Sequence, residues 1–148
     1  MQKIMAIMIG LQGSGKSTFC TKELSKDYVR VNLDTLKTRH QERLLIDECL
    51  REGKSFVIDN TNPTVEDRAR YISSAKANEY HIIGYFMESK LKDCIARNAL
   101  REGKARIPEK AIAATSNKLV IPSLDEGFDE LYFVKNDGTT MIVEPWRT

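Results

Sequence analysis

The chain has 148 residues, a length that fits one domain and is sufficient to bury a hydrophobic core. Hydrophobic residues make up 41% and charged residues 30% of the sequence, which argues against an intrinsically disordered chain. The net charge of +2 is too small to indicate a nucleic-acid or membrane binder by itself, so any anionic partner must be bound by a local basic patch.

Cysteine usage and apolar runs bear on the compartment. The 3 cysteines are too few and too scattered for a disulfide framework or a zinc site, and they are typical of small buried residues in a reducing compartment. The longest apolar run, residues 4–9, is too short to span a membrane, and the N-terminal residues lack the features of a signal peptide. We therefore expect a cytoplasmic protein with no membrane partner and, since no linker or repeat divides the chain, a single domain over residues 1–148.

Predicted strands and helices alternate along the chain. Residues 3–9 form a continuous apolar run that ends at Gly10, as expected for a strand that is buried on both faces of a parallel sheet. Further strands are predicted at residues 28–32, 55–58, 80–87 and 131–134. Helices are predicted at residues 17–25, 34–52, from about 64, 90–101 and 109–119. An Asn-Asp-Gly turn at residues 136–138 favours a C-terminal hairpin at the sheet edge, and the alternation as a whole predicts an α/β fold with a mostly parallel, five-stranded core.

A phosphate loop follows the first predicted strand. Residues 10–17 match the pattern G-x-x-x-x-G-K-S/T in full, and they lie between a buried strand and a helix, as the mechanism requires. The location disfavours the alternative of a glycine-rich turn that binds nothing. Glycines let successive backbone N–H groups point at phosphate oxygens, and the N-terminus of the next helix supports the same anion. The predicted ATP-binding residues of the loop are Gly10, Gly13, Ser14, Gly15, Lys16, Ser17 and Thr18.

Two side chains of this phosphate loop have distinct predicted roles. Lys16 can reach the β- and γ-phosphates, and the Ser17 hydroxyl can bind Mg²⁺. GTPases, ATPase motors and small-substrate kinases all carry such a loop. The chain has little room for the appendages of a motor, and it lacks the N-K-x-D motif of GTPases. A compact kinase of the nucleoside-monophosphate-kinase type remains.

Two aspartates follow predicted strands. Asp34 comes after the second strand and Asp59 ends the third, and ligands of open α/β sheets bind beyond the carboxyl ends of strands. A phosphoryl acceptor needs a base for its hydroxyl, and we assign that role to Asp34. We assign Asp59 to the metal side, as in a Walker B motif. The alternatives are a helix N-cap for Asp34 and a loop turn for Asp59 and Asn60.

The chain resembles the kinase domain of the polynucleotide 5′-hydroxyl kinase family, which occurs in viral and animal end-healing enzymes. The matching segments follow the family's order and cover nearly the whole chain: Gly13-Ser-Gly-Lys-Ser-Thr18, Val31-Asn-Leu-Asp-Thr-Leu36, Ile58-Asp-Asn-Thr-Asn-Pro63, Asp67-Arg-Ala-Arg-Tyr71, Arg97-Asn98 with Arg101, Ile107-Pro108 and Leu124-Asp-Glu-Gly-Phe128. The resemblance implies a P-loop kinase three-layer sandwich with strand order 2-3-1-4-5.

The resemblance also implies residue roles. Asp34 falls where the family places the general base, and Lys37 where some members carry an arginine that holds the phosphate next to the acceptor hydroxyl. Arg101 falls on the lid arginine that contacts the donor phosphates. Leu33 departs from the family, which often has arginine there. The residues assigned to the acceptor are Asp34, Lys37, Asp59 and Asn60, and those assigned to the metal are Ser17 and Asp59.

A basic segment at residues 97–110, here called the lid segment, contains Arg97, Arg101, Lys104, Arg106 and Lys110. Arg97 and Arg101 are four residues apart and are expected to share a helical face and to bind ATP. Gly103 offers a joint, and closure would exclude water from the γ-phosphate. For Lys104 and Lys110 the preferred alternative is a solvated helix face.

The sequence therefore predicts ATP-dependent and Mg²⁺-dependent phosphorylation of the 5′-hydroxyl end of DNA or RNA, with Asp34, Lys16 and Arg101 as catalytic residues. The 148 residues contain no segment that resembles the phosphatase or ligase domain that relatives often carry, and we expect a separate phosphatase or ligase as a candidate partner. A small-molecule or nucleoside kinase and a non-catalytic nucleotide-dependent interaction module are the alternatives. Lys37, Arg39 and Arg43 could line a path for an acceptor strand or be simply solvated, and Trp146 could stack on a base or seal the sheet edge.

Overall fold

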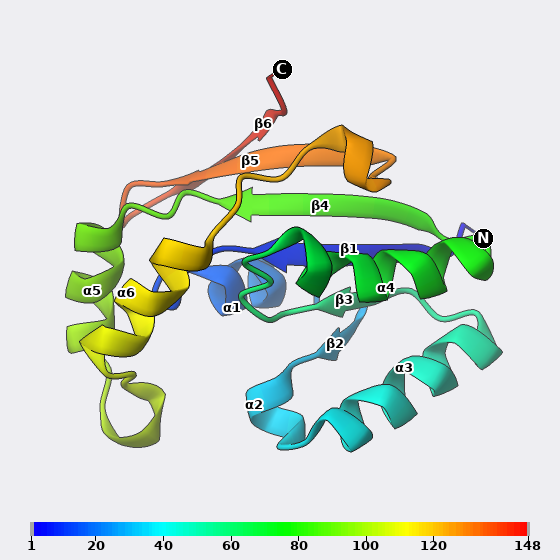
Figure 1. Cartoon of the computed structure of the whole chain (residues 1–148), viewed down its shortest axis with the longest axis horizontal. Coiled ribbons are helices and arrows are strands. Elements are labelled where there is room, and N and C mark those ends of the chain that lie inside the picture. Colours follow the sequence, from blue (N-terminus) through cyan, green and yellow to red (C-terminus); the bar gives the residue numbers. More distant parts are fainter. Residues whose placement is uncertain (1, 148) are drawn as a thin grey trace.

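In the computed structural model, the described residues 2–147 form a six-stranded sheet with helices on both faces (Figure 1). The strands are β1 (Ile4–Ile9), β2 (Val29–Val31), β3 (Phe56–Ile58), β4 (His81–Met87), β5 (Glu130–Asn136) and β6 (Met141–Pro145). Their order is β2-β3-β1-β4-β5-β6; the first five strands are parallel, and β6 runs antiparallel to β5. The predicted five-stranded order and the C-terminal hairpin are both confirmed.

The helices connect the parallel strands, and some of them lie at the carboxyl end of the sheet. They are α1 (Lys16–Phe19), which continues as the π-helical segment η1 (Cys20–Leu24), α2 (Leu33–Leu36), α3 (Arg39–Glu52), α4 (Val65–Ala77), α5 (Leu91–Ala99) and α6 (Glu109–Lys118). Two short 3₁₀ segments complete the described chain: η2 (Gly103–Ala105) and η3 (Leu124–Glu126). The carboxyl end of β4 leads toward α5 and α6, which lie side by side (Figure 1).

The single helix predicted at residues 34–52 is wrong, because the chain breaks between α2 and α3. Lys37 has a φ of 77°, which interrupts the helical backbone. Thr38 then starts α3 as an N-cap, since its hydroxyl accepts a hydrogen bond from the Gln41 N–H at 3.1 Å. The helix predicted at residues 90–101 likewise ends at Ala99, so Arg101 lies beyond it.

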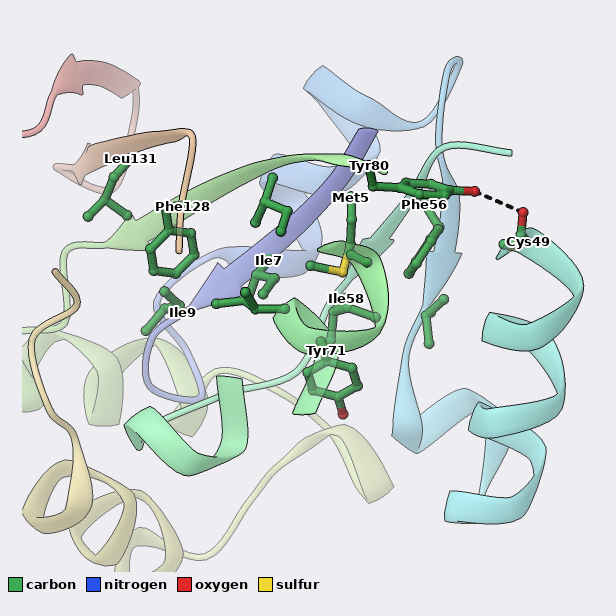
Figure 2. Packing of buried hydrophobic residues seen from close by; sticks show 14 residues of the cluster. Met5, Ile7, Ile9, Cys49, Phe56, Ile58, Tyr71, Tyr80, Phe128 and Leu131 are labelled. Carbon is green, nitrogen blue, oxygen red and sulfur yellow. Dashed lines mark hydrogen bonds between the residues drawn. The ribbon is translucent and has the colours of Figure 1, made fainter. Parts of the chain in front are cut away.

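Strand β1 is buried on both faces, as its apolar run predicts. Met5, Ile7 and Ile9 pack toward α3 and α4, where Figure 2 shows them among aromatic and aliphatic side chains of the neighbouring strands and α4. Ala6 and Met8 face α1 and η1. The helices on both faces thereby fix β1, and with it the start of the phosphate loop. The three cysteines are free and buried, as expected: Cys20, Cys49 and Cys94.

A buried ion pair joins α4 to η3. The Arg68 side chain is fully buried, and it donates to both carboxylate oxygens of Glu126 at 2.7 and 3.0 Å and to the Asn62 carbonyl oxygen at 3.0 Å. We expect Glu126→Ala to lower the free energy of unfolding by about 3–5 kcal/mol, because it leaves a buried guanidinium without its counter-charge. Urea denaturation measures this loss. The neighbouring exposed Asp125→Ala is the control, and an equal loss in both variants would contradict the prediction.

Candidate functional site

The phosphate loop is held from outside by two distant elements. Gly13 has a φ of 83°, and a Cβ at this position would lie 2.4 Å from the Cys94 carbonyl oxygen, so only glycine fits against α5. Arg97 donates to the Gly13 carbonyl oxygen at 3.1 Å, and the Asn136 amide donates to the Ser14 carbonyl oxygen at 2.9 Å. These contacts fix the shape of the loop, and Arg97 contributes to that support.

Lys16 is buried at the start of α1. Its Nζ donates to the Leu11 carbonyl oxygen at 2.7 Å. Removal of its ammonium group from water lowers the pKa of Lys16 from 10.5 to about 8, and the nearby Asp59 carboxylate offsets only part of this effect. The lysine thus folds over the phosphate loop at some electrostatic cost, and phosphate oxygens would relieve that cost.

Nucleotide binding should consequently take up a proton in alkaline solution. A phosphate anion beside Lys16 favours the ammonium form, so binding should raise the Lys16 pKa from about 8. Above this pH the free protein carries a largely neutral lysine, and affinity for ATP should fall as pH rises, up to about tenfold per unit. Calorimetric titration near pH 9 in two buffers that differ in ionisation enthalpy measures the uptake. Equal apparent enthalpies in both buffers would contradict it.

Asp59 directly follows β3, and its side chain is 1% exposed. The Ser17 hydroxyl donates to its Oδ2 at 3.1 Å, and Arg30 Nε donates to the same oxygen at 2.7 Å. Arg30 Nη2 also donates to the Ser17 hydroxyl at 3.1 Å. The sequence analysis did not single out Arg30. Its charge in the middle of a predicted strand, next to the strand that leads to Asp59, could have indicated it.

The Ser17 and Asp59 pair fits Mg²⁺. Within residues 2–147, Asp59 Oδ1 is buried and accepts no hydrogen bond, so an oxygen is free for a cation beside the Ser17 hydroxyl. Mg²⁺ takes one or two protein oxygens and completes its octahedron with phosphate and water oxygens. The same residues contain no group of three or more histidine, cysteine or acidic side chains that could hold a metal by themselves. A site of this kind depends on nucleotide phosphates for the rest of its ligands.

Asp34 lies in the first turn of α2 and is not the N-cap. Asn32 is the cap, because its side-chain oxygen accepts from the Thr35 N–H at 3.0 Å, while its amide donates to the Asp59 carbonyl oxygen at 2.6 Å. The Leu33 N–H donates to the Asn60 side-chain oxygen at 3.0 Å. The loop after β3 thus fixes the start of α2, and the capping alternative for Asp34 is excluded.

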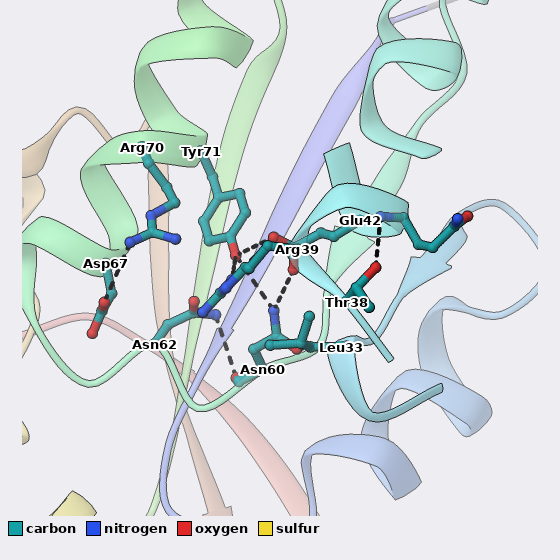
Figure 3. Close-up of polar contacts among 10 residues, drawn as sticks. Leu33, Thr38, Arg39, Glu42, Asn60, Asn62, Asp67, Arg70 and Tyr71 are labelled. Carbon is teal, nitrogen blue, oxygen red and sulfur yellow. Dashed lines mark hydrogen bonds and ion pairs between the residues drawn. The ribbon is translucent and has the colours of Figure 1, made fainter. Parts of the chain in front are cut away.

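A buried carboxylate, Glu42, accepts hydrogen bonds from α3, from α4 and from the loop after β3 (Figure 3). It accepts hydrogen bonds from the Asn60 amide, the Tyr71 hydroxyl and Arg39, all at 3.0 Å. Burial, followed by the Glu42 charge, raises the pKa of Tyr71, so this hydroxyl stays protonated. Glu42 thereby ties α3 and α4 to the loop that holds α2. Neither periodicity nor a motif singled out Glu42.

The structure brings most predicted site residues to one cavity of about 860 Å³ at the carboxyl end of the sheet. Its lining includes the predicted residues Gly13, Lys16, Ser17, Asp34, Lys37, Asp59, Asn60 and Arg101. A second cavity of about 520 Å³ lies on the other side of the phosphate loop and is lined by Gly13, Gly15, Thr18, Arg97 and Arg101 among others. Gly10 and Ser14 are buried within the loop itself.

The lid segment is closed at its base by Asn98. Its amide donates to the Ile107 carbonyl oxygen, and the Ile107 N–H donates back to its side-chain oxygen at 2.8 Å. Gly103 has a φ of 58° and open space around it, as a joint requires. Arg101 is the residue of the lid segment that lines both cavities, whereas Lys104 lines the first cavity alone and Arg97 the second alone.

The weaker candidate Trp146 and the histidine His81 lie away from the cavities. Trp146 packs its ring against Phe86 of β4, with 5.9 Å between ring centroids. His81 Nε2 pairs with the Glu130 carboxylate at 2.5 Å on the β4–β5 surface. Over residues 2–147, the helices are too short and too polar for any of them to traverse a bilayer.

Comparison with known proteins agrees with this geometry. Residues 5–120 match the model of the AAA domain family. A bifunctional polynucleotide phosphatase/kinase of Schizosaccharomyces pombe is 33% identical over 128 residues, which are 84% of this chain and 31% of that protein. A protein of Acanthamoeba polyphaga mimivirus that carries the same assignment is 35% identical over 137 residues, which are 88% of this chain and 32% of that protein. The chain therefore spans about a third of the length of these relatives.

Among solved structures, a gluconokinase from Sinorhizobium meliloti 1021 has a similar fold. Its TM-score is 0.61 at 16% identity, and the match covers 90% of this chain and 82% of that one. The fold prediction, a P-loop kinase sandwich, is confirmed, and so is the resemblance to polynucleotide kinases at the level of sequence. These similarities support a phosphotransferase with a nucleotide-binding phosphate loop.

Proposed function

The chain belongs to the AAA domain family, and on that premise we propose that it is an ATP-dependent kinase that transfers the γ-phosphoryl group to the 5′-hydroxyl of DNA or RNA. The observation that carries the proposal is the first cavity, whose wall includes the phosphate loop and the Asp34 carboxylate together. The names of the curated relatives support a polynucleotide acceptor.

The proposed reaction is an in-line displacement at the γ-phosphorus, in which the acceptor oxygen bonds to phosphorus as the bond to the leaving oxygen breaks. Asp34 orients the acceptor hydroxyl and takes its proton. Lys16 and Arg101 stabilise the charge on the transferred group. Mg²⁺ held by Ser17 and Asp59 would supply further positive charge at the β- and γ-phosphates.

Arginine side chains shared by two cavities support a strand over a small molecule as acceptor. The first cavity shares Arg39, Arg70 and Tyr71 with a third cavity of about 330 Å³ that also has lining residues from α3 and α4. Guanidinium groups at such a junction suit the phosphates of a nucleic-acid backbone. A nucleoside would fill only the part next to Asp34. Lys37 is proposed to hold the first of these phosphates, beside Asp34 and Asn60.

The test is transfer of label from γ-labelled ATP to DNA and RNA oligonucleotides with a 5′-hydroxyl. The expected product carries the label at its 5′ end, and the same oligonucleotide with a 5′-phosphate should remain unlabelled. A free nucleoside and gluconate serve as small-molecule acceptors. Label on either of these with none on the oligonucleotides would replace the proposal by the small-molecule alternative, whereas no acceptor labelled at all would favour a non-catalytic module.

Arg101 should act mainly in the transition state. We expect Arg101→Ala to lower kcat by about a hundredfold, less than arginines contribute in the best-studied systems because this one is partly exposed, and to raise the KM for ATP much less. Arg101→Lys should recover little, since an ammonium lacks the two-pronged guanidinium geometry. Steady-state kinetics on a 5′-hydroxyl oligonucleotide measures both. Lys104→Ala is the control, and equal damage from it would mean a diffuse basic surface.

A further inference from the structure

We infer that Arg30 is a built-in cation beside the proposed Mg²⁺ site, where it contacts Ser17 Oγ and Asp59 Oδ2 and leaves Asp59 Oδ1 free. The nucleotide-bound metal must displace it from Ser17 and from the charge of Asp59, and Arg30 thereby sets how much metal the site requires. This inference rests on the proposed function, specifically on the assignment of Ser17 and Asp59 to Mg²⁺. Arg30 is not among the predicted site residues, and its contacts are with those two side chains.

The guanidinium contacts both ligands at once. Its Nε lies 2.7 Å from Asp59 Oδ2, and its Nη2 lies 3.1 Å from Ser17 Oγ. The Ser17 hydroxyl donates a hydrogen bond to Asp59 and accepts one from Arg30. A metal ion coordinates a hydroxyl through an oxygen lone pair, so metal binding at Ser17 competes with the N–H of Arg30.

The position of Arg30 on the sheet explains why it reaches this site. Arg30 pairs in register with Val57, which is two residues before Asp59 on the neighbouring strand. Val57 packs on the face of the sheet that α1 covers, and Ser17 belongs to α1. The side chain of Arg30 therefore starts on the face where both oxygens lie. An almost fully buried Asp59 carboxylate needs a counter-charge when no metal is bound, and Arg30 supplies it.

The two partners differ in their freedom to move. The Arg30 side chain is 40% exposed, whereas that of Asp59 is 1% exposed. The guanidinium can rotate into water while the carboxylate stays in place, so exchange of one cation for another needs no movement of β2 or β3. The exchange makes apparent metal affinity weaker than the oxygens alone would give. Because Arg30 is partly exposed, we expect it to weaken the apparent metal affinity by a factor of about three to ten.

The test measures metal binding without phosphoryl transfer. Mn²⁺ is titrated into the protein with a non-hydrolysable ATP analogue, and unbound Mn²⁺ is followed by electron paramagnetic resonance. Arg30→Gln should lower the half-saturating Mn²⁺ concentration about threefold to tenfold. Arg30→Lys, which keeps the charge but loses the two-pronged contact, should tighten binding less and covers the case in which Arg30→Gln does not fold. Arg51→Gln, at the exposed end of α3, should leave binding unchanged.

The outcomes separate the two levels of inference. Unchanged or weaker Mn²⁺ binding in both Arg30 variants overturns the role of Arg30, since an arginine that helped to hold the nucleotide would weaken binding when replaced. Asp59→Asn is tested alongside and should abolish the tight site. If Asp59→Asn binds Mn²⁺ as the unsubstituted protein does, the metal assignment within the proposed function fails, and the inference on Arg30 fails with it.

Discussion

Lys16→Ala should abolish phosphoryl transfer, with a loss in kcat of at least about a thousandfold. Lys16 is the side-chain cation of the phosphate loop, and it is buried at the wall of the first cavity. In so poorly solvated a position its charge acts on the γ-phosphoryl group with little screening by water. Single-turnover transfer to a 5′-hydroxyl oligonucleotide, at an ATP concentration that saturates the variant, measures the loss separately from weaker binding.

The fold itself should survive this substitution. Lys16 is held in the native state at an electrostatic cost, which the lowering of its pKa to about 8 reflects, so its removal should not lower the melting temperature strongly. Lys26→Ala removes an exposed lysine beyond η1 and should leave kcat unchanged. Retention of normal turnover by Lys16→Ala at saturating ATP would mean that the phosphate loop is not the donor site.

Local sequence patterns were sufficient for the parts of the fold that depend on neighbours in the chain. The apolar run of β1, the phosphate loop after it and the Asn-Asp-Gly turn of the last hairpin each carry a signal within a few residues. The break between α2 and α3 was missed because a positive φ at Lys37 has no signature in a lysine, and because Thr38 inside a helical pattern is ambiguous between a cap and a helical residue.

The unpredicted parts of the site are contacts between residues distant in sequence. Arg30 and Asp59 form a contact although they are 29 residues apart in the sequence, and Glu42 and Asn60 are 18 residues apart. The first pairing depends on the adjacency of β2 and β3, and the second on the contact of the first turn of α3 with the loop after β3. Strand order came from the family resemblance and not from periodicity, so these contacts could not be derived from the residues alone. What the sequence could do was place Asp34 and Asp59 at neighbouring strand ends, and the first cavity has both in its wall.

Asp34→Asn separates a catalytic carboxylate from a structural one. We expect kcat to fall by about two to four orders of magnitude, because asparagine keeps the shape but cannot accept the proton of the acceptor hydroxyl. The KM for ATP should change little, since in the proposed function the donor phosphates bind to the phosphate loop and not to Asp34. Asp34 is exposed in the first turn of the four-residue helix α2, so loss of its charge should barely alter the melting temperature.

Substitution of Asn32 provides a comparison that distinguishes a loss of turnover from a loss of stability. Asn32 is the N-cap of α2 and also donates to the Asp59 carbonyl oxygen, so Asn32→Ala should lower the free energy of unfolding by about 1 kcal/mol or more. Asp34→Asn should therefore lower kcat and leave the free energy of unfolding nearly unchanged, whereas the main effect of Asn32→Ala should be a lower free energy of unfolding. Glu48→Gln removes an exposed carboxylate on α3 and should change neither quantity. If Asp34→Asn melts normally and also turns over normally, the carboxylate is not the base, and the acceptor hydroxyl must be activated by another group in the wall of the first cavity.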